Sequence, residues 1–184
     1  MKSDPIQDYI LTSEQNLCIA ATVYETWPEA RDQLVSEFLN RLRLKLLAQL
    51  NNWEFGKSER FFIDRDPCWY FWKPAWTDQY SVILQCPNYG ERMQFGLSRD
   101  ETHIKNRSFC PEALDAVKTI HPSAKAVPWY EALVTMRSPS PDWRRPEVLW
   151  RMRVDIKFLD DVAEQLLEVA KIVEPIIDGL VRKK

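Results

Sequence analysis

The chain has few of the residues from which common catalytic sites are built. It holds only four glycines and two histidines among 184 residues. Four scattered glycines cannot form the loop that cradles phosphate groups in nucleotide-binding proteins. The histidines, His103 and His121, and the serines Ser81 and Ser98 stand outside any nucleophile-elbow context. The sequence therefore offers no catalytic set.

Cysteine is also scarce, and its spacing is uninformative. Cys18, Cys68, Cys86 and Cys110 are spread along the chain without a CxxC pair. A zinc site would need ligands from distant segments, so we expect ordinary reduced thiols. Our prediction is a protein without a metal or other cofactor.

Long apolar runs and a strong net charge are missing as well. No stretch approaches the roughly 20 apolar residues of a membrane span, and the first residues lack an apolar targeting core. We therefore expect a cytoplasmic protein without a membrane partner. The formal charge is only −2, from 25 basic and 27 acidic residues, so nucleic acid is not the default partner.

What the chain does contain is apolar and aromatic side chains, at 45% and 12% of residues. This is enough to bury one sizeable core, and we expect a single domain over residues 1–184. The predicted class is α+β, with an antiparallel sheet of four to six strands packed against two long helices. We expect a helical segment over 1–25, a helix over 26–50, the sheet with a short helix over 53–136, and a C-terminal helix over 155–182.

The start of the predicted 26–50 helix is marked by a capping box. Thr26 can cap the amide near Glu29 while Glu29 reaches back, and Pro28 is tolerated in a first turn. Apolar residues then recur every three or four positions, which predicts a wide buried stripe. Its members are Leu34, Val35, Phe38, Leu39, Leu42, Leu46 and Leu50.

Strand-like runs follow at 68–76, 80–86 and 92–98, with turn signals at 64–67 and 87–90. They predict an antiparallel meander. A helix over 111–120 and a further strand over 127–136 complete the expected sheet region.

The run at 68–76 is crowded with aromatic residues. Side chains alternate along a strand, so Trp69 and Phe71 should face one way, with Tyr70 and Trp72 facing the other. The candidate binding residues of this run are Trp69, Trp72, Lys73 and Trp76, and three roles stay open for it. The run can be core, which we favour, a hot spot for a protein partner, or a stacking platform for nucleic acid.

The C-terminal helix carries an apolar seam from Leu159 to Leu180 that repeats by threes and fours. Such a seam can join two chains in a homodimer, or it can pack on the 26–50 helix of the same chain. We favour packing within the chain, because Pro175 interrupts the donor pattern near the end of the seam.

A second group of residues spells a nuclease motif. Pro141-Asp142 followed by Asp155-Ile156-Lys157 has the letters of a PD-(D/E)XK site, in which carboxylates hold a divalent metal and the lysine helps to activate water. In that chemistry the second acid and the lysine lie on a buried strand, whereas here they open a helix. The alternative is a carboxylate at a helix N-terminus.

The densest basic segment lies just before that helix. Its residues are Trp143, Arg144, Arg145, Trp150, Arg151, Arg153 and Lys157. Such a segment can bind phosphates or an acidic partner, although solvated arginines lying over apolar surface are the more frequent case.

The order of features from residue 16 to residue 100 is similar to a known pattern. Asn16-Leu17, Trp27-Pro28-Glu29-Ala30, Phe38-Leu39 and a tryptophan-rich meander ending in Phe95-Gly96-Leu97 follow one another. This order resembles the C-terminal, non-nuclease region of bacterial PD-(D/E)XK nuclease superfamily proteins of unknown function, often linked with mobile elements or phage defence. The resemblance implies a binding or regulatory half without its enzyme.

These observations favour a non-catalytic interaction or regulatory module of a bacterial or phage conflict system. Its partner would be a protein, such as a nuclease or ATPase subunit, bound through the aromatic sheet face or the basic segment. Two alternatives stay open: a metal-dependent nuclease using Asp142, Asp155 and Lys157, and a nucleic-acid-binding protein.

Overall fold

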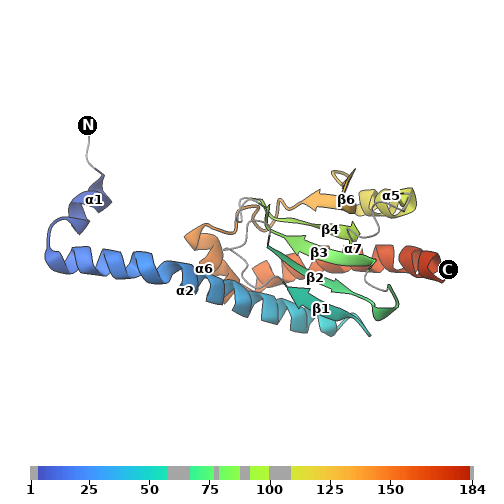
Figure 1. The fold of residues 1–184 in the computed structure, drawn as a ribbon, viewed down its shortest axis with the longest axis horizontal. Coiled ribbons are helices and arrows are strands. Elements are labelled where there is room, and N and C mark those ends of the chain that lie inside the picture. The colour runs from blue at the N-terminus through green and yellow to red at the C-terminus, as the bar shows by residue number, and fades with distance from the viewer. Residues whose placement is uncertain (1–3, 58–66, 77–78, 88–91, 100–108, 183–184) are drawn as a thin grey trace.

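The fold is known from a computed structural model, which describes residues 4–57, 67–76, 79–87, 92–99 and 109–182. The elements are α1 (Pro5–Ile10), α2 (Glu14–Leu47), β1 (Glu54–Lys57), β2 (Cys68–Trp72), the 3-10 helix η1 (Pro74–Trp76), β3 (Tyr80–Gln85), β4 (Gln94–Arg99), α5 (Pro111–Ile120), β5 (Lys125–Val127), β6 (Tyr130–Thr135), α6 (Pro146–Val154) and α7 (Ile156–Val181). The six strands form one antiparallel sheet in the order β1-β2-β3-β4-β6-β5 (Figure 1). The predicted α+β class is confirmed.

Side-chain alternation divides the sheet into a core face and an outer face. In β2, Trp69 and Phe71 are buried while Tyr70 and Trp72 are half-buried, as the sequence predicts. Phe71 pairs with Val82 of β3 and faces the core with it. The outer face carries a smaller apolar cluster built on Ile83, Tyr130 and Leu133.

The predicted seam of the C-terminal helix is used within the chain. Its residues from Leu159 to Val173 are buried, and α7 packs on α2, α5 and the core face of strands β3 and β4. Figure 1 shows α7 behind the sheet and α2 alongside it. Of the seam residues, Ile176 is half-buried and Leu180 is exposed. Because its own chain covers most of the seam, little of it remains for a second copy.

The predicted start of the 26–50 helix is wrong. Helix α2 begins at Glu14, where the Ser13 hydroxyl accepts the amide of Asn16, and it continues through Pro28 to Leu47. The Thr26 hydroxyl donates to the carbonyl of Thr22 one turn back, so it caps nothing. A capping box is a local signal, and a longer helix with an earlier cap overrides it.

The predicted apolar stripe is confirmed, and it lies in the second half of α2. The buried residues of the helix are Val35, Phe38, Leu39, Leu42 and Leu46. Leu34 is half-buried, and Leu50 is buried just beyond the helix. The helix thus has a packed half and an unpacked half.

The remaining differences from prediction lie in the connections. The strand expected over 127–136 is β6, preceded by the short antiparallel β5, with which it forms a hairpin. Helix α6 was not predicted. Residues 64–66 and 88–90 of the two predicted turns lie outside the described residues. Among the helices that the structure describes, none combines the length and the apolar character needed to cross a membrane.

A polar contact ties the aromatic run to the C-terminal helix. The Asp178 carboxylate accepts a 2.8 Å hydrogen bond from Nε1 of Trp76 and a 2.6 Å bond from Nζ of Lys73. Glu174 accepts from the same lysine at 2.9 Å. Burial on its own would raise the pKa of Asp178, but the bonds from Lys73 and Trp76 outweigh it and lower that pKa. Lys73 and Trp76 therefore hold the aromatic run against α7.

We predict that Asp178→Ala destabilises the fold by about 1–3 kcal/mol, because it leaves the indole N–H of Trp76 buried without its acceptor. A carboxylate with a lowered pKa stabilises above its unfolded-state pKa, and this share is lost as the pH falls through the folded-state value. Urea unfolding at several pH values measures both effects, and the stability difference between the two proteins should narrow in acid. Glu174→Ala, which leaves Trp76 bonded, should cost less. Equal losses in the two variants would contradict this role of Asp178.

Candidate interaction surfaces

Three of the tryptophans predicted as partner-binding residues lie in the core. Trp69 is 4% exposed, and Trp76 and Trp143 are fully buried. Trp143 meets the edge of Phe38 at 5.3 Å between ring centroids, and Phe158 lies at 6.0 Å. A partner cannot reach these side chains, so the prediction of a contact role for them is corrected.

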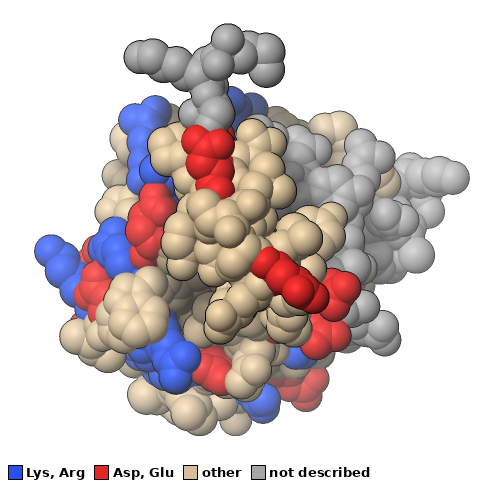
Figure 2. Space-filling view, turned by 90° about the vertical axis from the view of Figure 1, so that its left-hand side faces the viewer, with Lys and Arg blue, Asp and Glu red and all other residues tan. Residues whose placement is uncertain are grey.

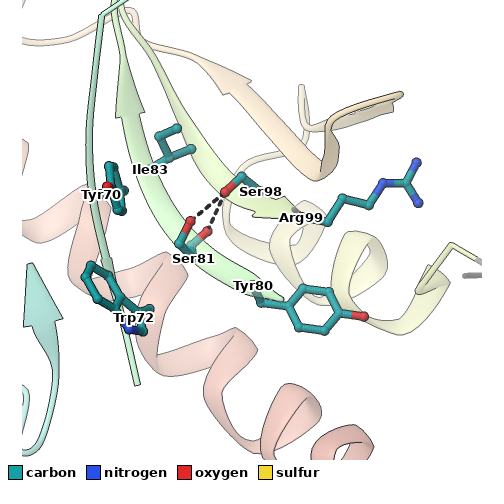
Figure 3. Close-up of a pocket in the computed structure, with 7 residues that line it drawn as sticks. All are labelled: Tyr70, Trp72, Tyr80, Ser81, Ile83, Ser98 and Arg99. Carbon is teal, nitrogen blue, oxygen red and sulfur yellow. Dashed lines mark hydrogen bonds between the residues drawn. The ribbon is translucent and has the colours of Figure 1, made fainter. Parts of the chain in front are cut away.

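The outer sheet face does have a hollow beside the predicted aromatic run. Its volume is about 430 Å³, within the range of small-molecule sites. Tyr70 and Trp72 stack at 5.5 Å along one wall, and Ile83 lies at the base (Figure 3). Tyr80 and Arg99 point away toward the opposite margin.

Two serine hydroxyls give this hollow its polar character. The hydroxyl of Ser98 donates to the carbonyl of Ser81 at 3.1 Å, and the two hydroxyl oxygens lie 2.7 Å apart. Both bonds form together only if the Ser81 hydroxyl donates to Ser98, because each serine has one hydrogen. The pair then offers only acceptors to a ligand. An aromatic wall beside acceptors suits a flat group that carries an N–H or O–H.

The arginine at the margin of the hollow is already engaged. Nε of Arg99 donates to the carbonyl of Pro128 at 3.0 Å, and its guanidinium lies 3.6 Å from the buried carboxylate of Glu131. Glu131 also accepts the amide of Cys110. Arg99 therefore joins the end of β4 to the β5–β6 turn and to Glu131 of β6, which weakens the case for an anion site here.

The predicted basic segment is largely neutralised by its own neighbours. Arg144 pairs with Asp142 at 3.1 Å, Arg145 with Glu147 at 2.7 Å and Arg151 with Asp155 at 3.1 Å. Apart from the residues of these ion pairs, the charged and large apolar side chains that are exposed on α6 and at the start of α7 are basic or apolar. We call this the α6 surface, and its residues are Trp150, Arg153, Val154, Ile156 and Lys157.

The two aspartates of the nuclease motif are each engaged by neighbouring groups of the chain. Asp155 caps α7 by accepting the amides of Lys157 and Phe158 while it pairs with Arg151. Hydrogen bonds from Arg144 outweigh the effect of burial and lower the pKa of Asp142. Within the described ranges no group of three or more His, Cys, Asp or Glu residues is placed to hold a metal ion.

The surface that the sequence analysis missed is the N-terminal arm, which we define as residues 4–30. It comprises α1 and the unpacked half of α2, and Figure 1 shows it projecting well beyond the sheet. None of its residues is buried. Its exposed large apolar residues are Ile6, Tyr9, Leu11, Leu17, Ile19, Val23, Tyr24 and Trp27. Soluble proteins rarely leave so many together unless a partner covers them.

The charged residues of the arm are all acidic. Residues 4–30 contain five acidic residues and no lysine or arginine. Figure 2 looks onto the projecting end, where tan and red atoms dominate and blue atoms gather to one side. The sequence held this signal, since the apolar positions from Leu17 to Trp27 cover about half of a helix, but the false capping box at Thr26 cut the pattern in two.

The comparisons with known proteins assign no role to these surfaces. No protein-family model, curated protein or solved structure matches the chain. The resemblance to the non-nuclease region of PD-(D/E)XK proteins therefore stays a prediction.

Proposed function

We propose that the protein is a non-catalytic interaction module that holds a protein partner through its N-terminal arm. The observation that carries this proposal is the exposure of the arm, where Tyr24 is 83% exposed and Leu17, Ile19 and Val23 are each more than half exposed. Burying such side chains contributes about 1.5–3 kcal/mol each, so a matching surface would bind well.

The arm is a better candidate than the outer sheet face. The hollow beside Trp72 is open and its lining residues are at least half-buried by their own sheet. The arm spans residues 4–30, which agrees with the roughly 20–30 residues that each side of a standard interface uses. The hollow can then serve as a secondary contact for a flat side chain of the same partner.

Site-specific photo-crosslinking tests the proposal. A benzoylphenylalanine in place of Tyr24 should form adducts of defined mass with a protein in extracts of the native host. The same group in place of the exposed Asp115 on α5 is the matched control and should not. Excess unlabelled wild-type chain should suppress adducts with any other protein, because it competes for the same partner. Equal labelling from both positions, or none from Tyr24, would contradict the proposal.

The enzyme alternative has a direct assay. The protein would be incubated with plasmid and with single-stranded DNA in Mg²⁺ or Mn²⁺, beside Asp155→Ala and Asp142→Ala variants. Cleavage that both substitutions abolish would replace the interaction module with a nuclease. A role in a bacterial or phage conflict system rests on the resemblance alone and stays part of the proposal.

A further inference from the structure

We infer that the N-terminal arm binds the α6 surface of a second copy of this chain. In the resulting dimer, each copy's arm contacts the α6 surface of the other. This inference rests on the proposed function and names its partner. It begins with charge, because the arm carries five acidic residues and no basic ones. Two arms lying on each other would bring like charges together and gain nothing from them.

The α6 surface has the complementary character. Residues 144–157 hold five basic and two acidic residues, and both acidic ones are paired with arginines of the same segment. Arg153 and Lys157 are exposed there. Between them lie the exposed apolar residues Val154 and Ile156, and Trp150 is 60% exposed nearby. An acidic, apolar helix thus matches a basic, apolar surface.

The positions of the two surfaces fit a reciprocal exchange. The packed part of α2 lies directly against α6, where Arg41 donates to the carbonyls of Met152 and Arg153. The arm therefore starts beside the α6 surface and points away from it at the same end of the molecule (Figure 1). A two-fold axis at that end places each arm against the other copy's α6 surface, as a self-complementary interface requires.

The decisive experiment uses two charge-reversed variants. The first is Glu25→Arg with Glu29→Arg in the arm, and the second is Arg153→Glu with Lys157→Glu on the α6 surface; all four side chains are exposed. Alone, each variant opposes like charges in both contacts. We expect the dimer dissociation constant to rise at least about tenfold, measured by sedimentation equilibrium.

Mixing the two variants restores opposite charges in both contacts at once. Equimolar mixing should therefore give a heterodimer of near wild-type affinity, and a chain with all four substitutions should form homodimers again. This recovery also excludes misfolding as the reason for dissociation.

A wild-type chain that stays monomeric at concentrations of about 100 μM overturns the inference, as does a dimer that neither pair of reversals weakens. The proposed function is tested separately. A monomeric chain whose Tyr24 position still crosslinks to a different protein retains the arm as an interaction surface, whereas a chain that neither dimerises nor crosslinks loses both.

Discussion

Trp143→Ala should destabilise the protein by about 3–5 kcal/mol. The indole is fully buried between Phe38 of α2 and Phe158 of α7, and its Nε1 donates to the carbonyl of Ser140 at 3.2 Å. Truncation removes two ring contacts, leaves a cavity where α2, α7 and the loop before α6 meet, and removes the donor to the Ser140 carbonyl. Urea unfolding followed by circular dichroism measures the loss.

The chain offers a matched control in Trp129, which is 49% exposed in the turn between β5 and β6. Trp129→Ala should change the free energy of unfolding by no more than about 0.5 kcal/mol. If both alanine substitutions changed the free energy of unfolding equally little, Trp143 would not be a core residue. The prediction that it contacts a partner would then be favoured.

Gly96→Ala should cost roughly 2–6 kcal/mol, from backbone strain and a steric clash combined. Gly96 lies in β4 between Ile83 and Leu133 and has a φ of +154°, which L-residues rarely adopt. A Cβ atom there would lie 2.0 Å from the carbonyl oxygen of Ala132. That oxygen belongs to the β6 backbone, so it cannot move without disturbing the β4–β6 pairing.

Gly179 provides the opposite case within the same protein. It lies inside α7, and an added Cβ meets nothing within 4 Å. Gly179→Ala should raise stability by up to about 1 kcal/mol, because alanine favours a helix and loses less backbone entropy on folding. A shared sign for the two glycine substitutions in thermal melts would contradict the special backbone of Gly96.

Periodicity predicted the parts of the fold in which one face is buried. The burial alternation of β2 and the buried seam of α7 both follow from spacing, because a two-residue or a 3.6-residue repeat reports directly on which side meets the core. The start of α2 was mispredicted because Thr26 to Glu29 has the letters of a cap while Ser13 supplies the actual one. A local sequence motif does not determine which of two possible N-caps the helix uses.

The candidate surfaces were harder to predict. The sequence of a tryptophan-rich run does not show which of its members are buried. Trp76 is buried and Trp72 is half-buried because η1, which contains Trp76, packs against α7. The ion pairs of the arginines could have been predicted, because Arg145 is close in sequence to Glu147, and Arg151 to Asp155. The apolar helical pattern of the arm was also present in the sequence, but its exposure could not be predicted, because exposure depends on whether other elements cover the helix.

Pro28 stands close to where the packed half of α2 gives way to the arm. Proline has no amide hydrogen, so the Tyr24 carbonyl loses the donor that an uninterrupted helix would supply from one turn ahead. When α2 frays from its N-terminus, unwinding reaches the missing hydrogen bond at Pro28 before it reaches any buried side chain. Amide hydrogens of residues 14–27 should therefore exchange with solvent deuterium far faster than those of residues 35–46, and a bound partner should slow the first group alone.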